Sequence, residues 1–188
     1  MRLFVAAALS PEVRRGLEEA QQELRSAAAA VRWVRVEGIH LTLRFLGDVD
    51  EGKRAPLVAA LKAVRGQAFE AAVRGIGFFP NPRRPRVVWA GVEEPTGRLA
   101  ALQRGVEEAV VRLGFEPEER GEFHPHLTLG RLGDPKRTGR LGEAAQAMEK
   151  REFGAFRVPA FQLFRSELRP DGARYSVLDT FPLEGGEG

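Results

Sequence analysis

The chain has 188 residues, of which 43% are hydrophobic and 29% charged, as in an ordinary globular protein with a sizeable core. It contains no cysteine, which excludes disulfide bonds and thiolate sites, and no apolar run long enough to cross a membrane, so a cytoplasmic location is expected. The net charge is +3, and 25 of the 29 basic residues (29 − 4 lysines) are arginine, a bias explained by a GC-rich genome or by phosphate binding.

Strand and helix signals alternate along the chain. Residues 2–9 predict a strand, and Ser10, Pro11 and Glu12 then form the N-cap and first turn of a helix that reaches about residue 30. Further strands are expected at 31–36, 39–46, 69–78, 86–92, 123–131, 153–168 (interrupted near Pro159) and 174–181, with helices at 52–64, 96–113 and 139–151. The turn at 170–172 and similar hairpin signals predict an α+β fold of antiparallel sheets with outer helices.

The tetrapeptide His-Leu-Thr-Leu occurs twice, at His40–Leu43 and His126–Leu129. These copies lie 86 residues apart (126 − 40), and RLFVAAALSPEVRRGL resembles RVVWAGVEEPTGRLAAL 84 residues further on (86 − 2). Such near-equal offsets predict a duplicated unit. We expect one bilobal domain over 1–184, with pseudo-symmetric halves at about 1–80 and 84–184, a central cleft between its two lobes, and a disordered tail at 185–188.

Each tetrapeptide places unlike side chains on the two faces of its strand. Because side chains alternate, histidine and threonine share one face and the leucines the other. In the first strand, alternation adds Arg44 to the face of His40 and Phe45 to the packed face; in the second, His124 joins His126. We therefore expect two imidazoles and two hydroxyls to face each other around one cavity.

This set of groups suits acid–base chemistry on a phosphate ester. Histidine has an unperturbed pKa of about 6.5, so one imidazole can act as a base while the other acts as an acid. Each such role is typically worth about 10²–10⁴ in rate. Threonine hydroxyls can donate to phosphoryl oxygens, and no metal or other cofactor is needed.

With HLTLRFLG, HPHLTLGR and the segment SELRPDGARYSVL, the chain resembles the 2H phosphoesterase superfamily. More narrowly, it is similar to the RNA 2′,3′-cyclic phosphodiesterase family, also called 2′-5′ RNA ligase. The resemblance implies a two-lobed fold and metal-independent hydrolysis of a ribose 2′,3′-cyclic phosphate to a 2′-phosphate. It implies that His40 and His126 are catalytic, His126 as base and His40 as acid, and that Thr42 and Thr128 bind substrate.

Three more side chains are candidates for substrate contact. The resemblance implies a phosphate contact for Arg131, but strand parity puts that residue on the leucine face, so a bend beyond Gly130 must redirect it. Arg44 shares the motif face and could touch phosphate. His124 has two readings, substrate contact and a structural role where the strand begins.

The expected partners are RNA with 2′,3′-cyclic phosphate ends or cyclic nucleotides, without a membrane, and the chain is expected to act as a monomer. The reverse reaction would join RNA ends by a 2′-5′ bond, but water at about 55 M favours hydrolysis. The basic loop Pro80–Arg86 could meet an RNA backbone or simply link the halves. Trp33, Phe78 and Phe79 could stack on bases, although aromatic residues belong more often to the core.

Two other functions fit parts of the pattern. A metal-dependent phosphodiesterase could use His124 and His126 with a carboxylate such as Glu122, but it would leave the repeated His-Thr pairing unexplained. A non-catalytic RNA- or nucleotide-binding module could keep the cleft, although it would not need both complete motifs.

Overall fold

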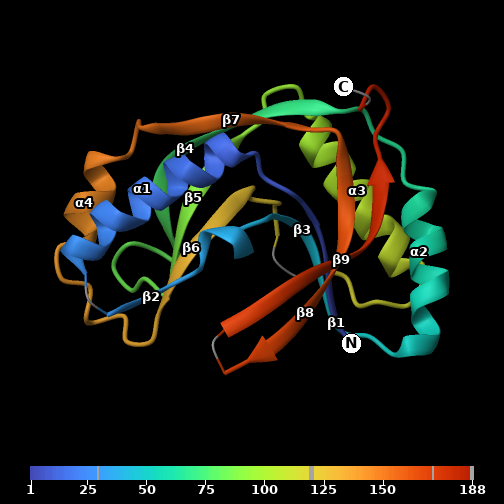
Figure 1. Cartoon of the computed structure of the whole chain (residues 1–188), viewed down its shortest axis with the longest axis horizontal. Coiled ribbons are helices and arrows are strands. Elements are labelled where there is room, and N and C mark those ends of the chain that lie inside the picture. The colour runs from blue at the N-terminus through green and yellow to red at the C-terminus, as the bar shows by residue number, and fades with distance from the viewer. Residues whose placement is uncertain (29, 119–120, 171, 187–188) are drawn as a thin grey trace.

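The computed structural model describes residues 1–28, 30–118, 121–170 and 172–186 and has an α+β fold with two antiparallel sheets (Figure 1). Sheet A has the strand order β3-β1-β8-β9 and sheet B the order β2-β6-β5-β4-β7. The strands are β1 Arg2–Ala7, β2 Val31–Trp33, β3 Leu41–Asp48, β4 Phe69–Phe79, β5 Val87–Glu93, β6 His126–Leu132, β7 Glu152–Val158, β8 Ala160–Arg169 and β9 Gly172–Pro182. The helices are α1 Pro11–Ala27, α2 Arg54–Lys62, α3 Arg98–Val111 and α4 Leu141–Ala147, with 3₁₀ turns at Val36–Gly38 and Glu51–Lys53. The predicted fold class is confirmed.

Helix α1 begins where its capping signal predicted. The Ser10 side chain accepts a hydrogen bond from the Val13 backbone N–H at 3.3 Å, and Pro11 occupies the first turn, where its missing N–H costs nothing. The apolar side of the helix, including Leu17 and Leu24, is fully buried. This side packs on β7, the edge strand of sheet B.

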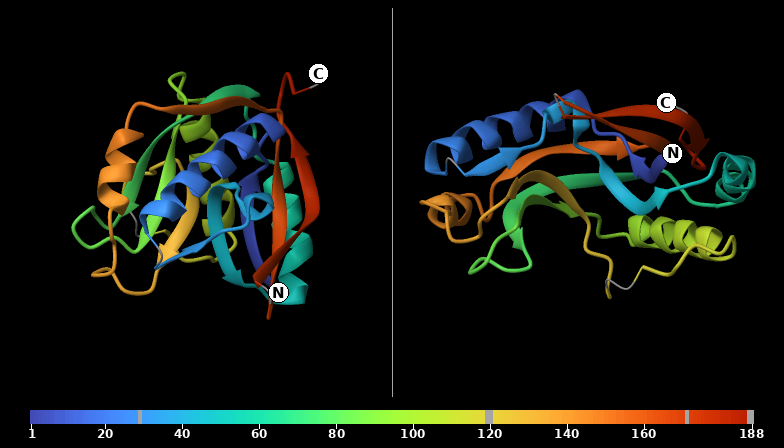
Figure 2. Two further views of the ribbon diagram at one scale, coloured as in Figure 1. Left: turned by 60° about the vertical axis from the view of Figure 1, so that its left-hand side comes forward. Right: turned by 90° about the horizontal axis from the view of Figure 1, so that it is seen from below.

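Two helices pack on the sheet to which the strand before them does not belong. Helix α1 follows β1 of sheet A but packs on sheet B, whereas α3 follows β5 of sheet B but packs on β3 of sheet A. Figures 1 and 2 show α1 and α4 together at one end of the molecule and α2 and α3 at the other. Each sheet also contains strands from both sequence halves, so neither half can bury its apolar surface without the other.

The chain changes sheets at Pro159. Strand β7 pairs with β4 in sheet B, and β8 pairs with β1 and β9 in sheet A. Proline has no N–H to give to a sheet, so the ladder stops there, as the interruption predicted near Pro159 indicated. The Pro159 carbonyl instead accepts from the Leu183 N–H at 2.9 Å, which ties the crossing to the end of β9.

One continuous apolar core joins the two sheets, with Leu41 and Leu43 of β3 and Leu127 and Leu129 of β6 all buried within it. No helix in the described ranges is long and apolar enough to span a bilayer. The tail expected to be disordered comprises residues 185–188. In it, the Gly186 backbone N–H donates to the Leu183 carbonyl at 3.0 Å, and residues 187–188 lie outside the described residues.

Candidate active site

The two motif strands line one cleft. Between the sheets lies a cavity of about 570 Å³ whose walls include His40, Thr42, His126, Thr128 and Arg131. Strands β3 and β6 also contact each other directly, although they belong to different sheets. The structure thus brings together the two histidines, the two threonines and the arginine that the sequence singled out.

Both motif strands carry a β-bulge at the same place. Leu43 and Leu129 are the last residues of the two tetrapeptides, and neither has a partner on the neighbouring strand β1 or β5. The residues before and after each leucine are paired with two consecutive residues of that neighbouring strand. An extra residue in one strand reverses the alternation of the side chains that follow it. The bulges therefore decide which residues after each motif reach the cleft.

In β3, the predicted alternation holds as far as Leu43 and is wrong beyond it. Arg44, expected on the motif face, is only 8% exposed, reaches to Glu107 of α3 and lines only the α3 side of the cleft. Phe45, expected on the packed face, is 48% exposed and lines the cleft, with its ring centroid 6.0 Å from that of Phe4.

In β6, the same reversal supplies the redirection that Arg131 required. The bulge at Leu129 turns Gly130 inward and Arg131 into the cleft, at the position equivalent to Phe45 in β3. Strand β2 packs tightly over this point, because a Cβ added to Gly130 would lie 2.6 Å from Cγ1 of Val31. Glycine is therefore needed here for close packing, while the neighbouring Arg131 reaches the cleft.

The two catalytic candidates are oriented in the same way. Nδ1 of His40 lies 3.0 Å from the Gly38 carbonyl oxygen, and Nδ1 of His126 lies 2.7 Å from the His124 carbonyl oxygen. A carbonyl can only accept, so each Nδ1 carries the proton, and Nε2 is the nitrogen that can exchange one. Each histidine is thus held by the backbone two residues before it.

Aromatic rings enclose the His40 imidazole. Its centroid lies 4.5 Å from that of Phe164, 5.4 Å from Tyr175 and 5.8 Å from Phe4. Phe4 and Phe164 stack on each other in a small cluster on the cleft side of sheet A. None of these three residues was predicted from the sequence, in which the one available signal was the single tyrosine within SELRPDGARYSVL.

Burial changes the titration of His40. Removal from water disfavours the imidazolium and is the main reason that the pKa of His40 is lowered from 6.5 to about 4. The positive charge of Arg14 lowers this pKa further, and the hydrogen bond to the Gly38 carbonyl opposes the change. His40 is therefore neutral at pH 7 in the unliganded protein.

The surroundings of His126 differ. Its ring lies edge-on to Phe79 at 4.8 Å, with Trp89 at 6.3 Å. The exposed His124 ring lies 5.2 Å from Trp89 and 5.8 Å from Phe79, while its carbonyl holds His126. The backbone of His124 therefore helps to orient His126 where β6 begins, and the His124 side chain lines the α3 side of the cleft.

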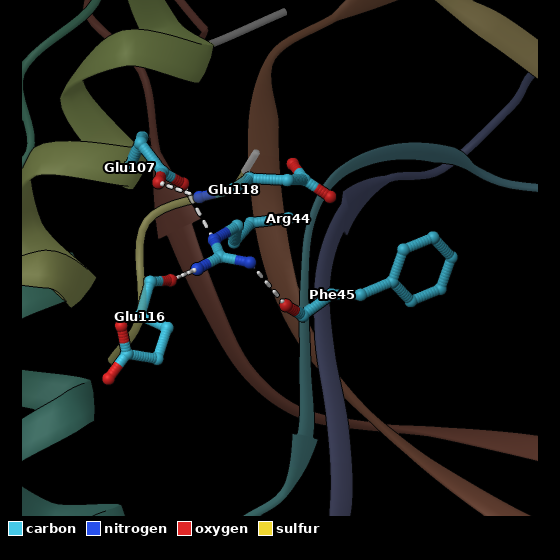
Figure 3. A network of polar contacts seen from close by, with 5 residues as sticks. All are labelled: Arg44, Phe45, Glu107, Glu116 and Glu118. Carbon is cyan, nitrogen blue, oxygen red and sulfur yellow. Dashed lines mark hydrogen bonds and ion pairs between the residues drawn. The ribbon is translucent and has the colours of Figure 1, made fainter. Parts of the chain in front are cut away.

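Arg44 is the centre of a polar network that braces β3 (Figure 3). Its Nε lies 2.6 Å from Oε2 of Glu107 on α3, and Nη1 donates to the Phe45 carbonyl at 2.9 Å. Nη2 donates to the Glu116 carbonyl, and Oε1 of Glu107 accepts from the Glu118 backbone N–H at 2.9 Å. The guanidinium that was a candidate for phosphate is thus engaged in joining β3, α3 and the loop before β6.

The second bulge is braced by the helix of the other half. The buried side chain of Gln21, on α1, donates to the Leu129 carbonyl at 2.9 Å and to the Val34 carbonyl at 2.8 Å. The Leu129 carbonyl also accepts from the Val34 N–H at 2.9 Å. Helix α3 holds Arg44 in β3, and α1 holds the bulge in β6. Each motif strand is therefore positioned by a helix from the other half of the sequence.

Other sequence candidates lie in several places. Phe78 is buried in the core, whereas Phe79 and Trp33 are half-buried and line different parts of the cleft. The basic loop Pro80–Arg86 joins adjacent strands β4 and β5 as a hairpin. Among the described residues, no three His, Asp or Glu side chains converge as a metal would require, and this includes Glu122 with the two histidines beside it.

Comparison with known proteins gives consistent matches over nearly the whole chain. The LigT-like phosphoesterase family matches residues 8–89 and 91–175. A Methanothermobacter thermautotrophicus protein named RNA 2′,3′-cyclic phosphodiesterase is 40% identical over 185 residues, covering 97% of this chain and 99% of that protein. A Thermus thermophilus protein of the same name is 40% identical over 200 residues, covering 100% of this chain and 93% of that protein.

Solved structures also match. TT0787 of Thermus thermophilus has a TM-score of 0.80 at 35% identity, and the match covers 97% of each chain. E. coli LigT, solved in complex with 3′-AMP, has a TM-score of 0.76 at 28% identity, again covering 97% of each chain.

Proposed function

The chain belongs to the LigT-like phosphoesterase family, and we propose that it hydrolyses 2′,3′-cyclic phosphate ends of RNA to 2′-phosphates without a metal ion. The resemblance predicted from the motifs is confirmed. The relatives' shared name, RNA 2′,3′-cyclic phosphodiesterase, supports the reaction. The cytoplasmic location and monomeric state expected from the sequence stay predictions.

The observation that carries the proposal is that two imidazoles with the same tautomer share one cleft. His40 and His126 each use Nδ1 to bind a backbone carbonyl, so each has Nε2 for proton transfer. Thr42 and Thr128, two residues further along each strand, line the same cavity. One base, one acid and two hydroxyl donors are the groups that an in-line displacement at phosphorus needs.

The proposed reaction proceeds as follows. Nε2 of His126 takes a proton from water, whose oxygen bonds to phosphorus as the bond from phosphorus to the 3′-oxygen breaks. Protonated His40 gives its Nε2 proton to that leaving oxygen, which becomes the 3′-hydroxyl. Thr42, Thr128 and Arg131 stabilise the negative charge on the non-bridging oxygens.

The role of His40 as acid depends on the substrate. With a pKa of about 4, its imidazole carries a proton in only a small fraction of unliganded molecules at pH 7. A phosphodiester anion bound beside it favours the charged form and raises this pKa. The acid is therefore formed as the substrate binds, which couples proton donation to the presence of phosphate in the cleft.

The same groups can join two RNA ends, because a hydroxyl can replace water as the nucleophile that attacks phosphorus. A 5′-hydroxyl of a second RNA end would take the place of water, and the product would be a 2′-5′ bond. Because water is present at about 55 M, we propose that ligation is a minor activity unless the two ends are held together.

The proposal is tested by incubating the protein with a nucleoside 2′,3′-cyclic phosphate in the presence of EDTA and separating 2′- from 3′-phosphate products. The expected result is a 2′-phosphate at a rate that EDTA does not change. Loss of turnover in EDTA with recovery on adding zinc or manganese would support the metal-dependent alternative. Binding of RNA without any hydrolysis would support the non-catalytic one.

A further inference from the structure

A second groove opens from the cleft beside His40. It has a volume of about 1020 Å³ and runs between the segment that contains β2 and the β8–β9 hairpin. His40, Arg131 and Tyr175 line both this groove and the central cleft, so the two spaces are continuous. A ligand whose phosphate lies between the histidines can therefore extend into it.

The groove is strongly basic. Its lining includes the arginines Arg32, Arg35, Arg131, Arg169 and Arg174, and Glu37 is its one acidic side chain among the described residues. Arg32, Arg35 and Arg131 are exposed, and none of the three forms an ion pair within the described part of the chain. Within the described ranges, the one ion pair of Arg169 is a long contact of 3.8 Å to Glu167. Arginine at this density, on a concave surface, is suited to a chain of phosphates.

Aromatic and apolar groups stand among these arginines. Trp33 and the 37%-exposed Tyr175 line the groove from opposite walls, and Leu168 on the hairpin is 75% exposed. A basic track with interspersed stacking surfaces is how proteins hold single-stranded nucleic acid. The α3 side of the cleft is different, because three glutamates line it, Glu107 and two in the loop before β6.

The substrate is asymmetric too, because RNA continues on only one side of its cyclic phosphate. A 2′,3′-cyclic phosphate occupies both ribose oxygens of the last nucleotide, so the rest of the RNA can leave only through the 5′ side. We propose that this groove binds the RNA strand on the 5′ side of the cyclic phosphate, with Arg32 and Arg35 contacting its backbone phosphates. The proposal rests on the proposed function and adds that the preferred substrate is a single-stranded oligonucleotide, not a free cyclic mononucleotide.

The test compares two substrates and three matched double variants. The substrates are cytidine 2′,3′-cyclic phosphate and an eight-nucleotide single-stranded RNA with a cyclic phosphate end. The variants are Arg32→Gln/Arg35→Gln in the groove, Arg83→Gln/Arg84→Gln in the β4–β5 loop, and the exposed pair Arg15→Gln/Arg25→Gln on α1 as a control for charge loss. Both kcat/KM and binding of the labelled oligonucleotide are measured, the latter against salt concentration.

The groove variant should lower the ratio of kcat/KM for oligonucleotide over mononucleotide roughly tenfold, and each lost phosphate contact should reduce the salt slope of binding by about 0.7. The other two pairs should leave the ratio within about twofold. An unchanged ratio in the groove variant, or the same loss in the α1 pair, overturns the proposal, and a loss confined to the loop pair assigns RNA to the loop instead. If the wild type hydrolyses neither substrate, the proposed function fails, while binding and its salt slope still decide the groove.

Discussion

The two motif strands carry the same tetrapeptide in unlike settings. Strand β3 is the edge of sheet A, whereas β6 lies between β2 and β5 inside sheet B. Both have a bulge at the second leucine of the tetrapeptide, and in both the motif histidine is held by the backbone carbonyl two residues before it. The two imidazoles are thus presented in the same way, although the two strands hold different positions in their sheets.

The strands differ in the two residues that follow the bulge. The inward position is Arg44 in β3 and Gly130 in β6, because β3 has α3 and a loop beside it while β6 has β2 packed against it. The cleft position is Phe45 in β3 and Arg131 in β6. The neighbouring elements therefore make Arg44 a structural anchor in one copy and place the Arg131 side chain in the cleft in the other.

Replacing either histidine should have the largest effect on catalysis. His40→Asn and His126→Asn should each lower kcat/KM for a cyclic mononucleotide by about 10²–10⁴, since each deletes one proton-transfer role. The double variant should be little worse than the more damaged single one, because the groups act as a unit. Steady-state kinetics on variants with unchanged circular dichroism checks this, and a loss below tenfold in both would contradict paired catalysis.

The anchor in β3 should matter chiefly for stability. Arg44→Ala leaves Glu107 partly buried without its cation, and we expect a loss of about 2–4 kcal/mol in the free energy of unfolding. The double change Arg44→Met/Glu107→Leu should recover most of that loss, because it removes both charges together. Urea unfolding measures both, and equal losses in the two variants would mean that the ion pair is not the cause.

The equivalent cleft positions should respond unequally. Arg131→Gln should lower kcat/KM about 10²-fold, as expected when a cation that stabilises the transition state is removed. Phe45→Ala, at the matching site in β3, should cost less than roughly tenfold, because it removes only an apolar wall. Kinetics on the cyclic mononucleotide ranks the two, and equal effects would argue against a phosphate contact by Arg131.

The smallest effect should come from the pKa of His40. Below pH 6.5 the unfolded chain binds a proton that the native protein does not bind until about pH 4, so stability falls as the pH drops through this window. Between pH 7 and pH 5 the wild type should lose about 1–2 kcal/mol more than His40→Asn. Urea unfolding at both pH values gives the difference, and parallel losses in the two proteins would show that His40 titrates normally.

Much of the fold and the site could be predicted from local patterns. The Ser10 cap, the break at Pro159 and the α+β class follow from short-range rules on hydrogen bonding and proline. The repeat indicated the histidines and threonines that line the cleft. Strand alternation put Arg131 on the same face as the leucines, which showed that a bend was needed to turn it into the cleft. The bulge itself could not be predicted, because the sequence does not show which residue will lack a cross-strand partner.

The chain by itself determined the paired histidines and threonines, their faces and their family, because alternation along a strand is a property of the backbone. Only tertiary structure decided that Arg44 would bind Glu107, that Phe45 would turn into the cleft and that burial among aromatic rings would lower the pKa of His40. These outcomes depend on which distant elements pack together, namely α3 on β3, α1 on sheet B and the β8–β9 hairpin beside the first motif. Packing over such separations is settled by how the whole core closes, which no short segment encodes.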